Sequence, residues 1–389
     1  MGPALSISLY YLALFAALGF YWPYLTLYLA GLGLPSGEIT RLAALGPLMG
    51  ALVPVAAGLL ADARTARVWI LRGASIGATA AFGALLAVGT GRLALYVVFA
   101  LFALCRAPLT ALVDATAVEE ARLRGGSYGR LRLCGSLGFF GAVATGGALY
   151  DAAGYRAVIV ATIVALAAAA ASAFALPAPP TERRTNVLRD WAALLRAPDV
   201  PLFLAAILLA QIACSAYDGC YSLHLARLGF DGRFVGAAWA VGVGAEVLLL
   251  AASGRLLAWL GAERMLAIAT AVAAARWLAI GHLSSGAAIL ALQPLHGITF
   301  GFYWVAGVSI VRARATADSA TAAQGLLAAT ASLGTVLGLF GAGTLFDRFG
   351  GGALFTVAAI AAAAAFVASA RFAATSGRQR TPVREAVAG

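Results

Sequence analysis

The sequence predicts an all-α polytopic membrane protein whose twelve transmembrane helices form two parallel six-helix repeats. Three features support this prediction: the composition, a series of long apolar runs and an internal repeat. Of the 389 residues, 62% are hydrophobic and 11% are charged, whereas about a quarter of the residues in a soluble protein are charged. The composition therefore excludes a soluble enzyme, a nucleic-acid-binding domain and a disordered chain.

The apolar runs are long enough to cross a bilayer as helices, which takes about 20 residues each. They are continuous, whereas the strands of a membrane β-barrel alternate apolar and polar residues over about ten positions. Turns that contain Gly or Ser separate them. The predicted spans are residues 4–30, 38–60, 68–89, 92–118, 133–150, 156–177, 201–225, 234–256, 264–283, 286–311, 324–345 and 351–371.

The positions of the arginines predict the orientation of the chain. All 27 residues counted as Lys or Arg are Arg, and the net charge is +11. With twelve spans both termini lie on one side, where the loops and helix ends carry 19 arginines against six on the other side. The positive-inside rule then places both termini in the cytoplasm. We expect a multi-pass protein of a bacterial inner, or plasma, membrane.

A polar linker and a repeat divide the chain into two halves. At an offset of 196 residues, segment 147–154 aligns without gaps with segment 343–350, so that Asp151 corresponds to Asp347. Parallel repeats of this kind rock around a central site in transporters. The predicted parts are an N-terminal six-helix bundle (1–177), a cytoplasmic linker (178–200), a C-terminal six-helix bundle (201–371) and a cytoplasmic tail (372–389).

The cysteines indicate packing rather than chemistry. None has the spacing of a metal-ligand motif such as CxxC, and all lie in or beside apolar runs, so we expect neither a disulfide framework nor a metal site. Small side chains of this type pack well between helices. The four are Cys105, Cys134, Cys214 and Cys220.

Several short motifs occur in an order that is typical of one transporter family. Residues 22–25 read WPYL, and the later motifs are GLLADARTAR (58–67), YGRLRL (128–133), WAVGVGAE (239–246), ARW (275–277) and QPLHGITF (293–300). Over essentially the whole chain they resemble the major facilitator superfamily, and within it the phenylpropionate permease branch, which is similar to the lactose permease and to nucleoside–proton symporters. The resemblance implies the fold of that superfamily and transport by alternating access. One position departs from the branch, because Cys134 stands where Trp is common.

Charged residues near the cytoplasmic ends of spans predict a conformational gate. A carboxylate at a helix end can pair with nearby arginines or cap a neighbouring helix, and so favour one of two rocking states. For the loop that contains Asp62, the alternative is a plain cytoplasmic anchor. The residues assigned to this gate are Asp62, Arg64, Arg67, Asp114, Arg130 and Arg132.

Three ionisable residues lie at a similar depth in consecutive spans. Glu246, Arg276 and His296 are all roughly 15–18 Å into the bilayer at about 1.5 Å per residue, where an unpaired charge costs about 2.5–3.5 kcal/mol. They can satisfy one another as a structural cluster, or they can couple protons to transport, because carboxylates and imidazoles are readily tuned. The resemblance to the lactose permease implies that Glu246 carries the proton, that Arg276 tunes its affinity and that His296 relays protons or binds substrate. Phe300 stands where a second carboxylate would follow, and Asp218 in the polar face of span seven is a further proton-coupling candidate.

Aromatic and polar residues inside the spans are the candidates for substrate binding. An arginine in a central cavity would attract a carboxylate, although Arg106 could instead bridge to Asp114, directly or through a neighbouring span. Tyrosines could stack on an aromatic or sugar ring, or they could form an aromatic belt at the membrane surface. The candidates are Tyr10, Tyr21, Tyr24, Arg106, Gln211, Tyr221, Trp239, Gln293 and Phe300.

We predict a proton-coupled symporter that takes up a small organic solute, such as an aromatic acid, a nucleoside or a sugar. The first alternative is a proton-driven exporter of drugs or metabolites, which often carries a Gly-Pro pair in span five that is missing here. A more distant alternative is a membrane sensor that does not transport. No HExxH motif or phosphate-binding loop indicates an enzyme. The expected partners are the solute, protons and the lipid bilayer, without nucleic acid, metal or cofactor other than the proton gradient, and a monomer is sufficient.

Overall fold

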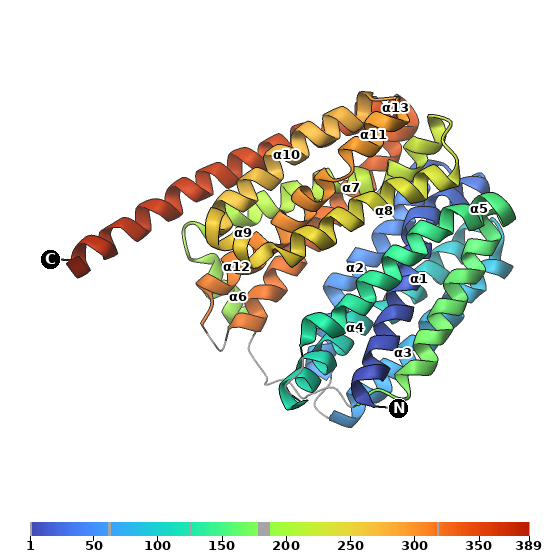
Figure 1. The fold of residues 1–389 in the computed structure, drawn as a ribbon, viewed down its shortest axis with the longest axis horizontal. Helices are drawn as coiled ribbons and strands as arrows, with labels where there is room; N and C mark the ends of the chain where they lie inside the picture. The colour runs from blue at the N-terminus through green and yellow to red at the C-terminus, as the bar shows by residue number, and fades with distance from the viewer. Residues whose placement is uncertain (1, 61–63, 125–126, 178–186, 317–318, 389) are drawn as a thin grey trace. The chain divides into compact units, whose positions relative to one another are not determined.

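The computed structural model describes residues 2–60, 64–124, 127–177, 187–316 and 319–388. Within these ranges the side chains of residues 54–60, 64–67, 187–188, 320–321 and 377–388 are left out of the description. The described residues are almost entirely helical and contain no β-strand (Figure 1). The predicted all-α class is confirmed.

Five helices make up the N-terminal half of the chain. They are α1 (Pro3–Gly31), α2 (Ser36–Leu60), α3 (Arg64–Val88), α4 (Arg92–Arg124) and α5 (Tyr128–Ala173). Helix α5 holds two predicted spans and changes direction at Gly154, whose φ of 74° is in the left-handed region that glycine adopts without strain.

The C-terminal half contains shorter and interrupted elements. They are α6 (Val187–Leu195), α7 (Val200–Arg227), α8 (Gly232–Ala251), α9 (Ser253–Leu260), α10 (Ala262–His282), α11 (Gly286–Leu292), the π-helical segment η1 (Gly297–Phe302), α12 (Tyr303–Arg314) and α13 (Ala320–Ala388). Helix α13 holds the last two predicted spans and turns at Gly350, with a φ of 79°.

The glycine turns bear out the internal repeat. Gly154 and Gly350, both with positive φ, are 196 residues apart, the offset found in the sequence. Gly33 and Gly229 are related by the same offset and also have positive φ, at 83° and 89°. The two halves therefore change direction at equivalent places.

Nine helices among the described residues are long and apolar enough to cross a membrane. Two of the nine, α5 and α13, contain two predicted spans each, and α11, η1 and α12 together form one. Helix α2 is not among the nine, but it covers the second predicted span. With these helices, the described residues account for all twelve predicted spans.

By compactness the chain divides into two units. The first consists of Met1–Arg184 and Asp218–Ala240, and the second of Thr185–Tyr217 and Val241–Gly389. Helices α7 and α8 thus contribute to both units. The predicted boundary at residues 178–200 stays a prediction.

In the first unit, α1 packs along α5, and α4 packs against α2 and α3. Small residues allow the close approach of α1 and α5. A Cβ atom on Gly19 would lie 2.5 Å from the main-chain oxygen of Phe139, and one on Gly138 would collide with the main chain of Leu12. Glycine at these positions lets the two helix backbones touch.

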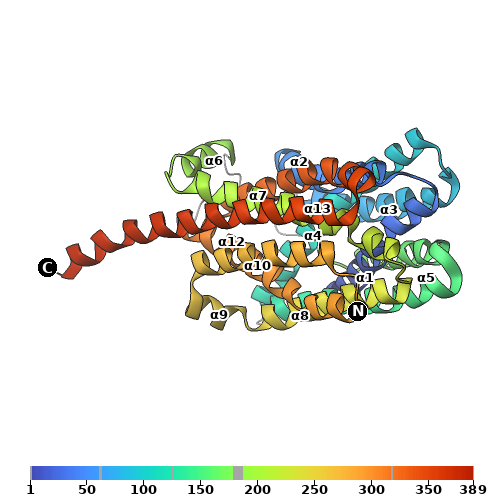
Figure 2. The ribbon, with the colours of Figure 1, turned by 90° about the horizontal axis from the view of Figure 1, so that it is seen from above.

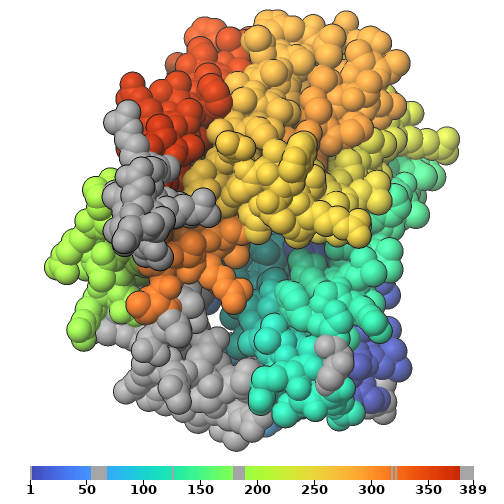
Figure 3. Space-filling view, turned by 60° about the vertical axis from the view of Figure 1, so that its left-hand side comes forward, coloured from blue at the N-terminus to red at the C-terminus, as the bar shows by residue number. Residues whose placement is uncertain are grey.

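The second unit has its own core, in which α7, α10, α12 and α13 meet. Its fully buried members include Phe203, Leu266, Ala306 and Phe372. Helices α10 and α13 run side by side, and α13 continues beyond the start of α10 (Figures 1 and 2). Helix α9 has no buried residue and lies in the yellow surface band of Figure 3.

An ion pair ties the start of α7 to the ends of α12 and the membrane-spanning part of α13. The guanidinium of Arg314 donates to one carboxylate oxygen of Asp199 from Nε at 3.0 Å and from Nη2 at 2.6 Å, and Ser376 donates to the same oxygen at 3.2 Å. Burial raises the pKa of the Asp199 carboxyl, but the hydrogen bonds and charge of Arg314 lower it more, so the pKa lies below its ordinary value.

Candidate functional site

A fully buried arginine organises the polar centre of the second unit. Helix α10 carries Arg276, whose side chain is 0% exposed. Its Nη2 atom donates to Oε1 of Gln293 at 3.0 Å, and its Nη1 atom donates to Oγ1 of Thr299 at 3.2 Å. The same Nη1 atom lies 3.4 Å from Nδ1 of His296. These neutral acceptors disperse a charge that would otherwise be costly inside a membrane.

The imidazole of His296 joins this arginine to a carboxylate. Its Nε2 atom lies 3.4 Å from Oε2 of Glu246, whose side chain is 19% exposed against 9% for His296. A neutral ring with its proton on Nε2 can donate to Glu246 and accept from Arg276 at the same time. A charged ring would instead turn an N–H group toward the guanidinium of Arg276. The geometry therefore fits a neutral His296 between a cation and a carboxylate.

Aromatic rings enclose the charged groups. The guanidinium of Arg276 lies over the rings of Tyr217 and Trp277, at 4.7 Å from each ring centre. Tyr217 and Phe300 both stack on the His296 ring, at 5.5 and 5.4 Å between centres. Cation–π contact stabilises a desolvated guanidinium, and the stacked rings fix the plane of the imidazole.

The backbone of span ten is broken where these side chains meet. Helix α11 ends at Leu292, a turn follows at Gln293 and Pro294, and η1 has the wider hydrogen-bonding pattern of a π-helix. Such segments often occur at functional sites, and interrupted helices line the binding sites of transporters. This break was not predicted from the sequence, although Pro294 within an apolar run was a signal for it.

Close packing of α8 against η1 brings Glu246 to His296. A Cβ atom on Gly297 would lie 2.9 Å from the main-chain oxygen of Ala245, and one on Gly242 would lie 3.3 Å from Cβ of His296. Larger residues at these glycines would push the two segments apart. The short distance between Glu246 and His296 thus depends on glycines in both segments.

The structure brings together Glu246, Arg276, His296 and also Gln293, which the sequence assigned to substrate binding. The amide of Gln293 is fixed, because its Nε2 atom donates to the main-chain oxygen of Ile289 at 2.8 Å. The hydroxyl group of Tyr217 also donates to Oε1 of Gln293 at 3.4 Å. In this structure Gln293 is an acceptor for Arg276.

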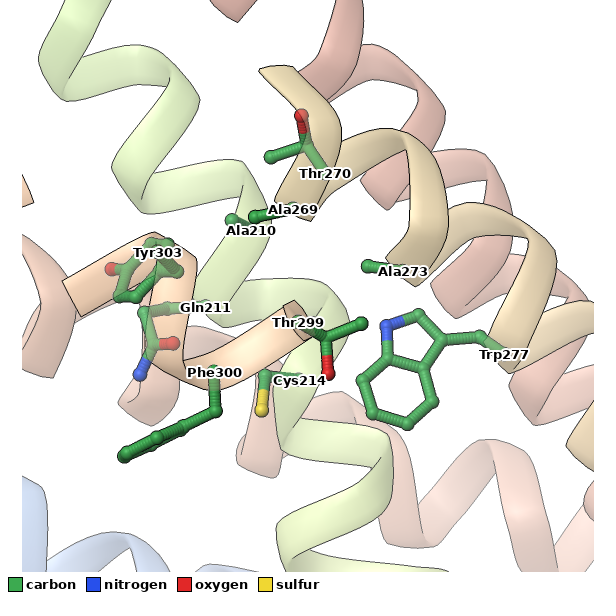
Figure 4. A pocket seen from close by; sticks show the side chains of 10 residues that line it. All are labelled: Ala210, Gln211, Cys214, Ala269, Thr270, Ala273, Trp277, Thr299, Phe300 and Tyr303. Carbon is green, nitrogen blue, oxygen red and sulfur yellow. The ribbon is translucent and has the colours of Figure 1, made fainter. Parts of the chain in front are cut away.

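A small cavity, of about 20 Å³, lies beside this network in the second unit (Figure 4). Two predicted substrate-binding residues, Gln211 and Phe300, line it. The full lining is Ala210, Gln211, Cys214, Ala269, Thr270, Ala273, Trp277, Thr299, Phe300 and Tyr303. The Nε2 atom of Gln211 donates to Oγ1 of Thr335 at 3.1 Å.

Asp218, Tyr221 and Trp239 belong to the first unit. There the indole nitrogen of Trp239 donates to the hydroxyl group of Ser222 at 3.1 Å, and the rings of Tyr221 and Trp239 meet edge to face at 6.0 Å. The proton-coupling role predicted for Asp218 stays a prediction.

A second polar cluster surrounds Asp114 in the first unit. One of its oxygens accepts hydrogen bonds from the hydroxyl groups of Tyr11 and, at 3.3 Å, Tyr128, and lies 3.9 Å from Nε of Arg132. The guanidinium of Arg132 also lies over the ring of Phe15 at 4.0 Å. Two residues of the predicted gate, Asp114 and Arg132, are therefore neighbours.

Of the other charged candidates of this unit, the structure describes the side chains of Arg106 and Arg130. Arg106 forms no ion pair with any residue that the structure describes, so the suggested Arg106–Asp114 bridge is not among the observed pairs. Arg130 is exposed. Asp62 lies outside the described residues, and so do the side chains of Arg64 and Arg67 near the start of α3.

The three tyrosines of α1 are packed inside the first unit. The hydroxyl group of Tyr10 lies 3.0 Å from that of Ser75, and Tyr24 donates to the main-chain oxygen of Val143 at 3.0 Å. The ring of Tyr21 packs against Phe82 of α3 and Phe102 of α4. In this structure these rings contact neighbouring helices, and their substrate-binding role stays a prediction.

An unpredicted contact lies at the other end of the first unit. The carboxylate of Asp151 accepts from the main-chain N–H groups of Gly232 and Arg233, both at 2.8 Å, and so caps the start of α8. A Cβ atom on Gly232 would collide with this carboxylate. Asp151 is part of the internal repeat, but its contact with α8 is not predictable from the repeat alone.

Comparison with known proteins places this arrangement in a family. Residues 4–357 match the model of the family described as MFS_1 like family. The maltose permease of Geobacillus stearothermophilus is 31% identical over 273 residues, which are 70% of this chain and 69% of that protein. The probable 3-phenylpropionic acid transporter of Escherichia coli (strain K12) is 29% identical over 216 residues, 55% of this chain and 57% of that protein.

Solved structures support the same assignment at the level of fold. The crystal structure of the nucleoside transporter NupG superposes with a TM-score of 0.81 at 16% identity, covering 96% of this chain and 99% of that one. An auto-inhibited POT family peptide transporter superposes with a TM-score of 0.72 at 14% identity, covering 97% of each chain. The protein is a multi-pass membrane transporter rather than an enzyme, and it belongs to the MFS_1 like family.

Proposed function

We propose that the protein is a proton-coupled symporter that takes up a small organic solute by alternating access. The observation that supports this most directly is the buried chain Glu246–His296–Arg276. In this chain His296 separates a carboxylate, which can gain or lose a proton, from a guanidinium that stays charged. Binding of one proton to the carboxylate therefore changes the net charge of the chain and can shift the equilibrium between two conformations.

In this mechanism Glu246 carries the proton. It is more exposed than His296, so it can exchange protons with water, and its hydrogen bond from His296 survives protonation because a neutral carboxyl group still has a carbonyl oxygen that accepts. Arg276 acts on Glu246 through the imidazole of His296, which connects the two groups while it stays neutral. Asp218 is the second candidate for the proton site.

The relatives suggest the class of solute. One is named a maltose permease and the other a probable 3-phenylpropionic acid transporter, so we propose a sugar or an aromatic acid, with a nucleoside as the further choice. The predicted gate around Asp114 and Arg132, the cytoplasmic termini, the inner-membrane location and the monomeric state belong to the same proposal.

The test is alkalinisation of the medium outside proteoliposomes when solute is added. Maltose, 3-phenylpropionate and uridine are added in turn to the wild type and to Glu246→Gln. We expect one solute to produce a signal that the substitution abolishes. Glu119→Gln is the matched control, because Glu119 pairs with Arg122 on the surface of α4, where ion pairs contribute little. A signal that survives in Glu246→Gln would move the proton site to Asp218 or His296.

A further inference from the structure

The cavity beside Trp277 has features of a binding site that the proposed coupling mechanism does not use. It lies between α7, α10 and the η1–α12 segment, next to the hydrogen bonds of Arg276. Two of its lining residues, Thr299 and Trp277, also contact the Arg276 guanidinium. Any group bound there would touch the network directly.

One donor at this cavity has no acceptor. The side chain of Trp277 is 2% exposed, and its Nε1–H group has no hydrogen-bond partner among the described residues. Buried N–H groups are nearly always hydrogen-bonded. In Figure 4 the nitrogen-bearing edge of the indole faces the side of the cavity where Thr299 lies. The donor is thus aimed at the enclosed space.

The size of the cavity restricts what it can hold. A volume of about 20 Å³ exceeds the about 10–15 Å³ that one water molecule needs, but it is too small for a sugar or aromatic ring. The site therefore fits a single oxygen with its hydrogens.

An acceptor for such an oxygen is also present. The hydroxyl group of Thr299 donates to the main-chain oxygen of His296 at 3.3 Å and accepts from Arg276 at 3.2 Å, which leaves one lone pair. A bound water needs two to four polar partners, and Trp277 and Thr299 supply two.

We propose that this cavity binds one hydroxyl oxygen, which accepts from Trp277 Nε1–H and donates to Thr299. The oxygen belongs to a water molecule or to a hydroxyl group of the solute. It holds the Thr299 hydroxyl in the orientation that accepts from Arg276, and so it links α10 and span ten beside the guanidinium. The site itself does not depend on proton coupling.

Ultraviolet resonance Raman spectroscopy of the full chain in lipid nanodiscs tests the proposal, because an indole band reports hydrogen bonding of the N–H group. The difference between wild type and Trp277→Phe isolates the band of Trp277. The position of a non-bonded band is taken from 3-methylindole in cyclohexane, a solvent that offers no hydrogen-bond acceptor.

A hydrogen-bonded band for Trp277 without solute identifies a water molecule. A band that becomes hydrogen-bonded only after maltose is added identifies a solute hydroxyl group. A band at the non-bonded position in both states would overturn the proposal, whatever the transport assays show.

A second variant keeps the test valid if Trp277→Phe does not fold. Ala273 lines the same cavity, and Ala273→Val adds two methyl groups there while Trp277 is retained. We expect the valine to exclude the oxygen and to shift the Trp277 band to the non-bonded position. A hydrogen-bonded band that is unchanged in Ala273→Val would contradict the proposed location.

Discussion

The Nε2 atom of His296 lies 3.4 Å from a carboxylate oxygen of Glu246, while the opposite nitrogen of the ring faces Arg276 at the same distance. The ring thus has an acceptor on one side and a donor on the other. This arrangement fits a neutral imidazole that donates through Nε2 and accepts through Nδ1. His296 therefore orients the charged groups and need not carry the proton itself.

The neutral role of His296 predicts a difference between two substitutions. A glutamine side chain can donate from its amide nitrogen and accept at its oxygen, so His296→Gln should retain measurable solute-driven proton uptake. His296→Phe keeps the ring but removes both polar contacts, and we expect a loss on the order of tenfold or more, equivalent to about 1.4 kcal/mol. Solute-driven proton uptake in proteoliposomes is measured for both variants. Equal loss in the two variants would indicate that His296 must be protonated.

Glycine at position 297 is predicted to hold Glu246 close to His296. In Gly297→Ala the new methyl group would lie 2.9 Å from the oxygen of Ala245, so α8 and η1 must separate. We expect a loss of about 1–3 kcal/mol in stability together with reduced proton coupling. Gly254→Ala in α9 is the control, since its Cβ meets nothing within 4 Å, and alanine there should leave thermal stability unchanged or raise it. Similar melting temperatures for the two variants would contradict the close packing.

The contact between Asp151 and the start of α8 predicts a local pattern of amide exchange. Its two oxygens hold the amides of Gly232 and Arg233, whereas Asp231 holds that of Phe234 at 2.8 Å. In Asp151→Ala the first two amides should exchange faster with solvent, and stability should fall by about 0.5–2 kcal/mol. In Asp231→Ala the effect should centre on Phe234. Residue-resolved hydrogen exchange distinguishes the two patterns, and unchanged exchange at Gly232 in Asp151→Ala would show that the cap is not formed.

The ion pair between Asp199 and Arg314 predicts a dependence of stability on pH. The pKa of the Asp199 carboxyl is lowered in the folded protein, so its contribution is complete above the unfolded pKa of about 3.9 and is lost as the pH falls through the folded value. Asp199→Asn should therefore lower stability by about 1.5–3 kcal/mol at pH 7. The difference from wild type should shrink below about pH 4. Thermal unfolding in detergent measures the stability of both proteins at each pH. A stability difference between wild type and Asp199→Asn that stays constant down to the lowest pH would contradict this account.

The features predicted best from the sequence are those that follow from the length and rise of a helix, such as the depth of a side chain in its span. Because a helix rises by a fixed amount per residue, counting from the ends of the spans placed Glu246, Arg276 and His296 at one depth, and the structure brings them into contact. The repeat predicted equivalent halves, and glycine turns at Gly154 and Gly350 agree with it.

The side-chain contacts that could not be predicted from the sequence depend on how each helix is rotated about its own axis. That rotation is set by packing with other helices, so Asp114 could not be matched with Arg132 and Tyr11 in advance, and bridging to Arg106 was considered instead. The π-helical turn was also missed, since it follows from local strain near Pro294 rather than from apolar periodicity.

The most direct test of the central claim separates solute movement from proton movement in Glu246→Gln. Exchange of labelled for unlabelled solute at equal concentrations needs no net proton transfer, whereas solute-driven alkalinisation does. We predict that exchange stays within about threefold of wild type while alkalinisation falls on the order of tenfold or more. Alkalinisation that persists in Glu246→Gln at wild-type rates would show that Glu246 does not carry the proton.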